Sequence, residues 1–361
     1  MKKNTSAVFH SCRLIFYAIL LIWFCLDLSF LLAGQKTRQQ KIIPLPELEA
    51  AYQVRAESGR VYVQDKKDIA VFSFATGKFL RRIGGQGQGP GEFSLLGHFR
   101  LVGNRLFAAD ILKILIFSAE GDYLGQLLPP SRIMRYPYLP VGNNFVGVPL
   151  ERKEDGTLLP PELVFYNQAG KPLKRVLQVP DVLPPPPPPP GASLPSSPQE
   201  SLMIREYFDY LVFDNKVFVA DSTKGLSISV FDEKGNLLYE IRHPVEKLKV
   251  SREDRGSIIK NMSEEFLKNF RPVFPDYFSS FVAFKIDGGK IYVVTPARKN
   301  NFNEVIVMDM KGKIIERSFC FPKKVDYFVP NSWAQTFDVE QGRFVWVEYN
   351  EATEQHELHI Y

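Results

Sequence analysis

The 361-residue chain has few of the residues that build disulfide frameworks or zinc sites, with three cysteines and five histidines. Three cysteines exclude a disulfide framework and a cysteine-rich zinc site. The histidines form no H-E-x-x-H motif, and neither a G-x-S-x-G motif nor a Ser/His/Asp order is visible in the sequence. The sequence therefore gives no support to catalysis by histidine or zinc.

An excess of one charge sign is also missing, since 45 basic residues face 40 acidic ones and the formal net charge is +5. Spread over this length the charge is a weak bias, and without a basic arm it does not favour nucleic-acid binding. The chain is 45% hydrophobic, which is typical of a folded protein. Its 29 Phe, 15 Tyr, 27 Pro and 24 Gly favour many short strands and turns over long helices.

Long hydrophobic runs are limited to one segment at the N-terminus, residues 14–34, which follows Lys2, Lys3 and Arg13. A basic region before an apolar one is typical of a secretory signal. The run approaches the ~20 residues that span a bilayer, but Asp27 would be costly in a permanent span. We expect residues 1–34 to be a cleaved signal peptide, the alternative being an uncleaved inner-membrane anchor that contacts the membrane through residues 14–34. Either way the protein is predicted to be exported, to the periplasm, the cell surface or the medium.

A turn residue followed by an apolar or aromatic strand recurs six times in the remaining chain. The copies begin at Gly59, Asn104, Asn143, Asn215, Gly289 and Gly342. Gly and Asn tolerate the positive φ that a two-residue hairpin turn demands. Each copy is flanked by further short apolar strands, so the unit is four antiparallel strands. Six such units predict an all-β fold, a six-bladed β-propeller over residues 35–361.

The sixth unit has three strands of its own, because the sequence ends at Tyr361 after the third. An open sheet edge invites aggregation. The segment of residues 40–46 is the spare candidate to fill this edge, although Pro44 and Pro46 limit its length. We expect this N-terminal strand to close the ring.

Residues 77–93, GKFLRRIGGQGQGPGEF, resemble the blade-to-blade signature of NHL-repeat-type and TolB-like six-bladed propellers. The chain is most similar to the exported bacterial group called six-bladed β-propeller proteins, over nearly all of residues 41–361. This resemblance implies the fold, an extracytoplasmic location, and binding as the general activity. The glycines at 84–91 are not expected to cradle phosphate, because neither a helix nor a Lys-Ser/Thr pair follows them.

The long segments between strands are all predicted to lie on one side of the propeller, which we call the looped face. They are residues 151–161, 180–207, 243–280, 296–303 and 322–333. Elaborated loops on a rigid scaffold are where function usually lies. The 180–207 insertion is Pro-rich: seven prolines, 184–190, form a stiff rod of about 22 Å, which we interpret as a spacer rather than a docking ligand.

The 243–280 insertion contains the helical pattern of the chain. Ser251 and Asp254 resemble a capping box, and an apolar residue recurs every fourth position at Ile258, Met262, Phe266 and Phe270. The pattern predicts an amphipathic helix over residues 251–270 whose apolar stripe packs on the propeller.

Acidic residues recur at the end of the second strand of several blades: Asp65, Asp110, Asp221 and, in the last blade, Glu348. We expect the aspartates to cap loop backbone N–H groups. The alternative is a ring of these four residues around a central calcium ion, as in the lactonase-like six-bladed hydrolases.

Aromatic residues beside cations recur in the crossings between blades. The candidate ligand-binding residues are Arg135, Tyr136, Arg205, Tyr207, Tyr210, Arg271, Tyr277, Tyr327 and Trp333. Such a set suits stacking on a sugar or gripping an anionic peptide or glycan. The alternative is that the aromatics pack between blades and the cations are solvated. The sequence thus predicts a non-catalytic binding or scaffold module of the cell envelope, without cofactor, for a protein, peptide or glycan. The second hypothesis is a calcium-dependent, lactonase-like hydrolase or lyase with its site in the central channel.

Overall fold

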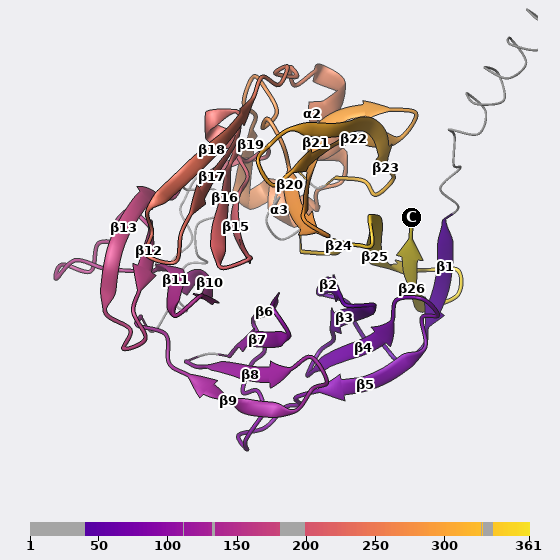
Figure 1. Cartoon of the computed structure of the whole chain (residues 1–361). Coiled ribbons are helices and arrows are strands. Elements are labelled where there is room, and N and C mark those ends of the chain that lie inside the picture. Colours follow the sequence, from indigo (N-terminus) through magenta and orange to yellow (C-terminus); the bar gives the residue numbers. More distant parts are fainter. Residues whose placement is uncertain (1–39, 111, 132–133, 181–198, 326, 328–334) are drawn as a thin grey trace, which may run out of the picture. The chain divides into compact units, whose positions relative to one another are not determined.

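Six four-stranded antiparallel sheets follow one another along the chain and surround a common axis in the computed structural model (Figure 1). The structure describes residues 40–110, 112–131, 134–180, 199–325, 327 and 335–361. The predicted leader at 1–34, the seven prolines and Trp333 lie outside the described residues. Residues 42–360 form one compact unit.

Each of the first three blades is formed by consecutive strands. Blade one holds β2 (Gln53–Glu57), β3 (Arg60–Gln64), β4 (Ile69–Ser73) and β5 (Phe79–Ile83). Blade two holds β6 (His98–Val102), β7 (Arg105–Ala109), β8 (Ile114–Ser118) and β9 (Tyr123–Leu127). Blade three holds β10 (Met134–Val141), β11 (Asn144–Pro149), β12 (Glu162–Tyr166) and β13 (Pro172–Gln178).

The last three blades complete the ring. Blade four holds β15 (Phe208–Phe213), β16 (Lys216–Asp221), β17 (Leu226–Phe231) and β18 (Leu237–His243), with the short 3-10 helix η1 (Ser222–Lys224). Blade five holds β20 (Ala283–Asp287), β21 (Lys290–Lys299), β22 (Phe302–Asp309) and β23 (Ile314–Phe321). Blade six holds β24 (Phe337–Glu340), β25 (Arg343–Asn350) and β26 (Gln355–Ile360).

The N-terminal strand closes the ring as predicted. Strand β1 (Lys41–Leu45) pairs beside β26 and is the outermost strand of blade six, in the order β1-β26-β25-β24. Blade one then packs on β1 through Gly77, whose φ is +72°. A Cβ at this position would lie 2.8 Å from Cδ1 of Ile43, closer than real side chains approach. The glycine therefore lets the first blade approach the strand that closes the last.

The hairpin turns between the first two strands of each blade are of two kinds. In blades one, four, five and six both central residues have positive φ, as in Ser58-Gly59 and Asp214-Asn215. In blades two and three only the first central residue, Gly103 or Gly142, has positive φ. The expectation of positive φ at Asn104 and Asn143 is therefore wrong, because the glycine before each asparagine takes up the left-handed conformation.

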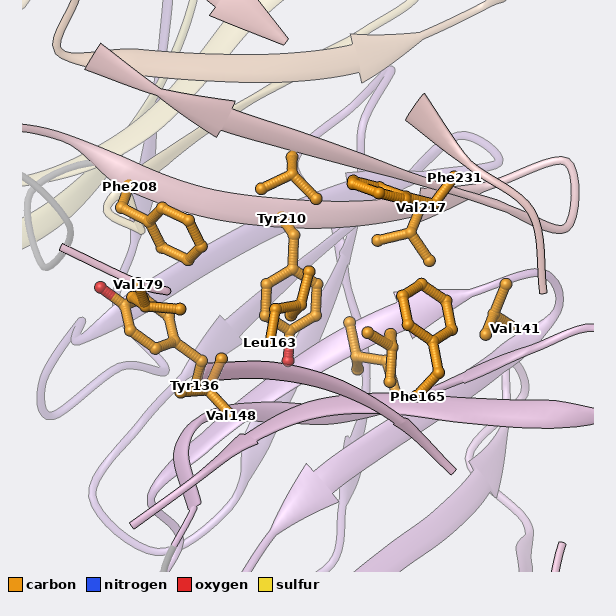
Figure 2. Packing of buried hydrophobic residues seen from close by; sticks show 13 residues of the cluster. Tyr136, Val141, Val148, Leu163, Phe165, Val179, Phe208, Tyr210, Val217 and Phe231 are labelled. Atoms are coloured by element: carbon orange, nitrogen blue, oxygen red, sulfur yellow. The ribbon is translucent and has the colours of Figure 1, made fainter. Parts of the chain in front are cut away.

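Buried side chains fill the space between neighbouring blades, as Figure 2 shows for blades three and four. Tyr136, Phe165, Phe208 and Tyr210 come from facing sheets, and the rings of Tyr136 and Phe208 meet edge to face at 5.3 Å between centroids. Burying one such aromatic side chain contributes about 1.5–3 kcal/mol, so each interface is a hydrophobic core of its own.

The helical insertion differs from the single helix predicted. It consists of α2 (Arg252–Lys260) and α3 (Glu264–Asn269), because Asn261 caps the end of α2 and Ser263 caps the start of a second helix. The Ser251–Asp254 capping box is confirmed. The stripe is only half-buried, and no residue within either helix is fully buried. No helix among the described residues is long and apolar enough to cross a membrane.

Two insertions that are far apart in sequence join in a small parallel sheet. Strand β14 (Gln199–Leu202), at the end of the Pro-rich insertion, pairs with β19 (Phe270–Val273), which directly follows α3. Arg271 and Glu200 form an ion pair across this sheet. A third segment, predicted as a loop at 296–303, is instead a hairpin in which β21 and β22 extend to a tight turn at Asn300-Asn301.

Candidate functional site

The repeated aspartates bind loop backbone, as the capping interpretation predicts. Asp65 accepts hydrogen bonds from the N–H groups of Ala50 (2.8 Å) and Lys66 (2.9 Å) and from Nη1 of Arg82 (2.9 Å). Although burial acts to raise the pKa of Asp65, these hydrogen bonds prevail and lower it. Asp110 likewise accepts from the N–H groups of Ser94 and Leu95. For Asp65 and Asp110 the capped loop is mainly the crossing that enters the blade, rather than the loop after the second strand.

The remaining members of the calcium hypothesis also have local partners. Asp221 caps η1 by accepting from Thr223, and it pairs with Lys224 at 3.1 Å. Glu348 pairs with Lys323 at 3.2 Å. Within the described part of the chain, no group of three or more His, Cys, Asp or Glu side chains is arranged to hold a metal ion. The structure therefore does not bring Asp65, Asp110, Asp221 and Glu348 together.

Three of the predicted ligand-binding aromatics lie inside the protein. Tyr207 and Tyr210 are fully buried, and Tyr136 is 5% exposed. The Tyr210 hydroxyl donates to the carbonyl of Pro137 in the neighbouring blade. Burial raises the pKa of both Tyr207 and Tyr210. Their surroundings match the alternative left open by the sequence, in which aromatics pack between blades, and they present no surface for stacking.

The predicted cations and the remaining aromatics are dispersed. Arg205 is buried and Arg135 is half-buried, whereas Arg271 is exposed and paired with Glu200. Tyr277 is 47% exposed, and Tyr327 is half-buried against Phe278, with 4.8 Å between ring centroids. The structure does not gather these residues into one ring, and ligand binding by Arg135, Arg205, Arg271, Tyr277 and Tyr327 stays a prediction.

Tyr327 does line a hollow of about 500 Å³ on the looped face. One wall is the apolar stripe of the two helices, with Ile258, Met262 and Phe266. The Phe278–Tyr327 pair also lines the hollow. The remaining lining residues are mostly polar or charged: Asp254, Ser257, Asn261, Ser263, Arg298, Lys324 and Val325. Burial raises the pKa of Tyr327 to about 12, so its hydroxyl is neutral at physiological pH.

A second and larger pocket, of about 820 Å³, lies around the axis and includes residues of the tight hairpin turns. It is lined by the innermost strand of each blade, and side chains two apart on a strand share a face. One set lies at the position three residues before each turn: Arg55, Arg100, Lys285 and Asp338. The other set lies directly before the turns: Glu57, Asp287 and Glu340. The two sets form charged layers on the axis, which were not among the residues predicted from the sequence. Comparing the six repeats position by position on this strand is the signal that finds them.

The inner layer, three residues before the turns, holds three buried cations. Arg100 is 3% exposed and its Nη2 lies 3.2 Å from Asp209 of blade four. Lys285 lies 4.9 Å over the ring of Phe337, and burial lowers its pKa. Arg55 donates from Nη1 to the backbone carbonyls of Val54 (2.7 Å) and Gln335 (3.2 Å). The inner layer therefore has a positive character.

The acids directly before the turns, at the mouth of this pocket, hold their protons more tightly than usual. Burial, together with the charges of Asp338 and Glu340, raises the pKa of Glu57 to about 7. Burial also raises the pKa of Asp287 and Glu340, although each accepts a hydrogen bond from a turn of the next blade, at Gly342 and Gly59 respectively. A positive charge at this mouth would be stabilised by all three carboxylates.

The comparisons with known proteins agree with this architecture. A family model named DUF5128 and described as a 6-bladed beta-propeller matches residues 46–137. The chain is a six-bladed β-propeller. No curated protein matches it.

Solved structures with a similar fold share little sequence with the chain. The WD40 domain of Neurospora crassa Pan2 is 9% identical, with a TM-score of 0.42 over 90% of this chain and 96% of that one. A gluconolactonase from Xanthomonas campestris is 11% identical, with a TM-score of 0.42 over 90% of both chains. A protein of unknown function from Bacteroides caccae is 10% identical, with a TM-score of 0.39 over 74% and 80%. All three TM-scores lie below 0.5, so these likenesses carry no argument about this chain.

Proposed function

We propose that this propeller is a non-catalytic binding module of the cell envelope that holds a protein partner through the looped face. The observation that carries the proposal is the hollow lined by the apolar stripe of residues 258–266 and by the Phe278–Tyr327 pair. Hydrogen bonds between blades support the scaffold, as where the N–H groups of Gly342 and Gly59 donate to Asp287 and Glu340 of the preceding blades. The partner is a peptide segment of a protein.

The chemistry of the hollow selects the kind of segment. Ile258, Met262 and Phe266 are half-buried apolar side chains that a ligand would cover further. Methionine and aromatic walls adapt to apolar side chains of different shape. Two cations, Arg298 and Lys324, line the hollow together with one acid, Asp254. We therefore expect a segment with a large apolar residue flanked by an acidic one.

The test is a selection from a peptide library against the purified protein, with a glycan array in parallel. Enriched peptides should carry a large apolar residue beside Asp or Glu. Met262→Lys should abolish their binding, because it places a charge in the apolar wall. Ile259→Lys is the matched control: Ile259 lies on α2 beside the lining residue Ile258 and is 38% exposed, but it does not line the hollow. Equal loss in both variants, or binding of glycans alone, would refute the proposal.

We also propose that the protein is exported, by way of the basic and apolar pattern of residues 1–34. The measurement is the intact mass of the protein recovered from the cells that produce it. A mass lacking the leader supports a cleaved signal peptide. A full-length mass in a membrane fraction supports the anchor, and full-length protein in the cytoplasm would refute export.

A further inference from the structure

The pocket on the axis separates opposite charges by depth. Counted from the turns inward, the first charged layer is acidic, with Glu57, Asp287 and Glu340, and the next holds three buried cations and one acid, Asp338. This pocket opens among the hairpin turns, away from the looped face and its hollow. A ligand that suits it carries a negative charge at the end that enters and a positive charge at the end that stays near the mouth.

Arg100 supplies the most specific feature of the inner layer. Its guanidinium uses Nη2 for Asp209, whereas the buried Nε and Nη1 have no hydrogen-bond partner. Buried N–H groups of a charged side chain are costly to leave unpaired, and a carboxylate is a strong acceptor for a guanidinium group. The side chain lines the pocket while being only 3% exposed. An oxygen anion that enters the pocket would satisfy donors that the folded protein leaves open.

Charged side chains of both signs on the inner strands surround this position. Arg55 and Lys285 support an anion, while Asp209 and Asp338 oppose it, and each of these acids already has partners: Arg100 for Asp209, and the N–H of Ala56 (3.1 Å) for Asp338. With Arg100 the cations of the layer outnumber these two acids. The mouth acids would repel a plain anion, but they favour a ligand that also carries an ammonium group.

The spacing of the layers indicates how far apart the two charges of the ligand lie. The backbone positions of the two layers are two residues apart along a strand, which is about 6.6 Å. The termini of an extended dipeptide are separated by a similar length, about 6.6–7 Å for two residues. An α-amino acid has its ammonium and carboxylate groups attached to the same carbon and is too short to reach both layers.

We propose that the axial pocket binds a dipeptide zwitterion, with its carboxylate on Arg100 and its ammonium among Glu57, Asp287 and Glu340. This site is independent of the hollow on the looped face. It needs neither a metal ion nor a chemical step.

Isothermal titration calorimetry of the purified protein tests the proposal with four related probes. They are alanyl-alanine, its N-acetyl form without the ammonium, its C-terminal amide without the carboxylate, and free alanine. Alanyl-alanine should bind, and each of the other three should bind at least tenfold more weakly, since each loses a charge-assisted hydrogen bond or cannot span the layers. An amide that binds as tightly as the acid, or the absence of alanyl-alanine binding, would overturn the proposal.

Variants then locate the carboxylate. Arg100→Lys keeps a cation beside Asp209 but removes the guanidinium donors, and it should weaken alanyl-alanine binding by about 10- to 100-fold. Arg105→Lys is the matched control, because Arg105 lines the same pocket but is exposed, and it should leave the affinity unchanged. Unchanged affinity in Arg100→Lys would overturn the assignment. If that variant does not fold, the four-probe comparison on the unaltered protein decides. Met262→Lys should retain dipeptide binding, which separates this site from the looped face.

Discussion

Closure of the ring by the N-terminal strand can be tested at a single glycine. Gly77 is the residue of blade one that packs on Ile43 of β1, and a Cβ there would lie 2.8 Å from Cδ1 and 3.0 Å from Cβ of Ile43. We predict that Gly77→Ala destabilises the propeller by forcing blade one away from the closing strand. The φ of Gly77, +72°, adds backbone strain to the steric overlap.

A second glycine separates the two costs. Gly59 has a φ of +75°, and a Cβ there would meet no atom within 4 Å. Gly59→Ala should therefore lose only the left-handed strain, about 1–2 kcal/mol. Gly77→Ala should lose that amount and a further 1–3 kcal/mol, roughly the cost of overpacking a filled site. The difference between the two variants measures the contact with β1.

The assay is equilibrium unfolding in urea, followed by the fluorescence of the buried Trp346. Adding Ile43→Ala to Gly77→Ala should relieve the overlap, so the double variant should be more stable than the sum of the single effects by about 1–2 kcal/mol. Equal losses in Gly77→Ala and Gly59→Ala, or strict additivity in the double variant, would refute the reasoning.

Three further predictions concern the axis, the caps and the insertion. The pKa of Glu57 is raised to about 7, so the folded protein holds this proton, and the stability that the protonated form contributes is lost as pH rises from about 4.5 through 7. Relative to the wild type, Glu57→Gln should gain up to about 3 kcal/mol in unfolding free energy between about pH 5 and pH 8. The same substitution at the exposed Glu351 should give no such gain. Asp65→Ala should lower the unfolding free energy by about 2 kcal/mol or more, because it leaves loop N–H groups and Arg82 without an acceptor. Thermal melts with and without a chelator should show the same loss of stability. A loss seen only without chelator would instead indicate a bound ion. Ser251→Ala should cost α2 about 1 kcal/mol, seen as faster amide exchange confined to that helix, and a change in global stability of similar size would contradict its peripheral position.

Much of the architecture was readable in the sequence because its determinants are local. The turn residues, the short apolar strands and the spacing between them recur in each blade, and each repeat is one supersecondary unit. Six copies with one strand missing predicted the closing strand β1. The aspartates at the ends of second strands and the Ser251–Asp254 box were also predictable, since a cap binds backbone close to it in the fold of its own unit.

The tertiary structure alone decided which side chains meet. A repeat places Tyr207 and Tyr210 before or on an inner strand, but only the packing of neighbouring blades shows that both are buried and therefore not ligand platforms. The pairing of β14 with β19 and the break between α2 and α3 depend on contacts between insertions that carry no shared pattern. Above all, Arg100, Lys285 and Glu57 come from three different blades, and their layers on the axis exist because the ring brings six innermost strands together. Local patterns fix each blade, whereas the axis is a property of their closure.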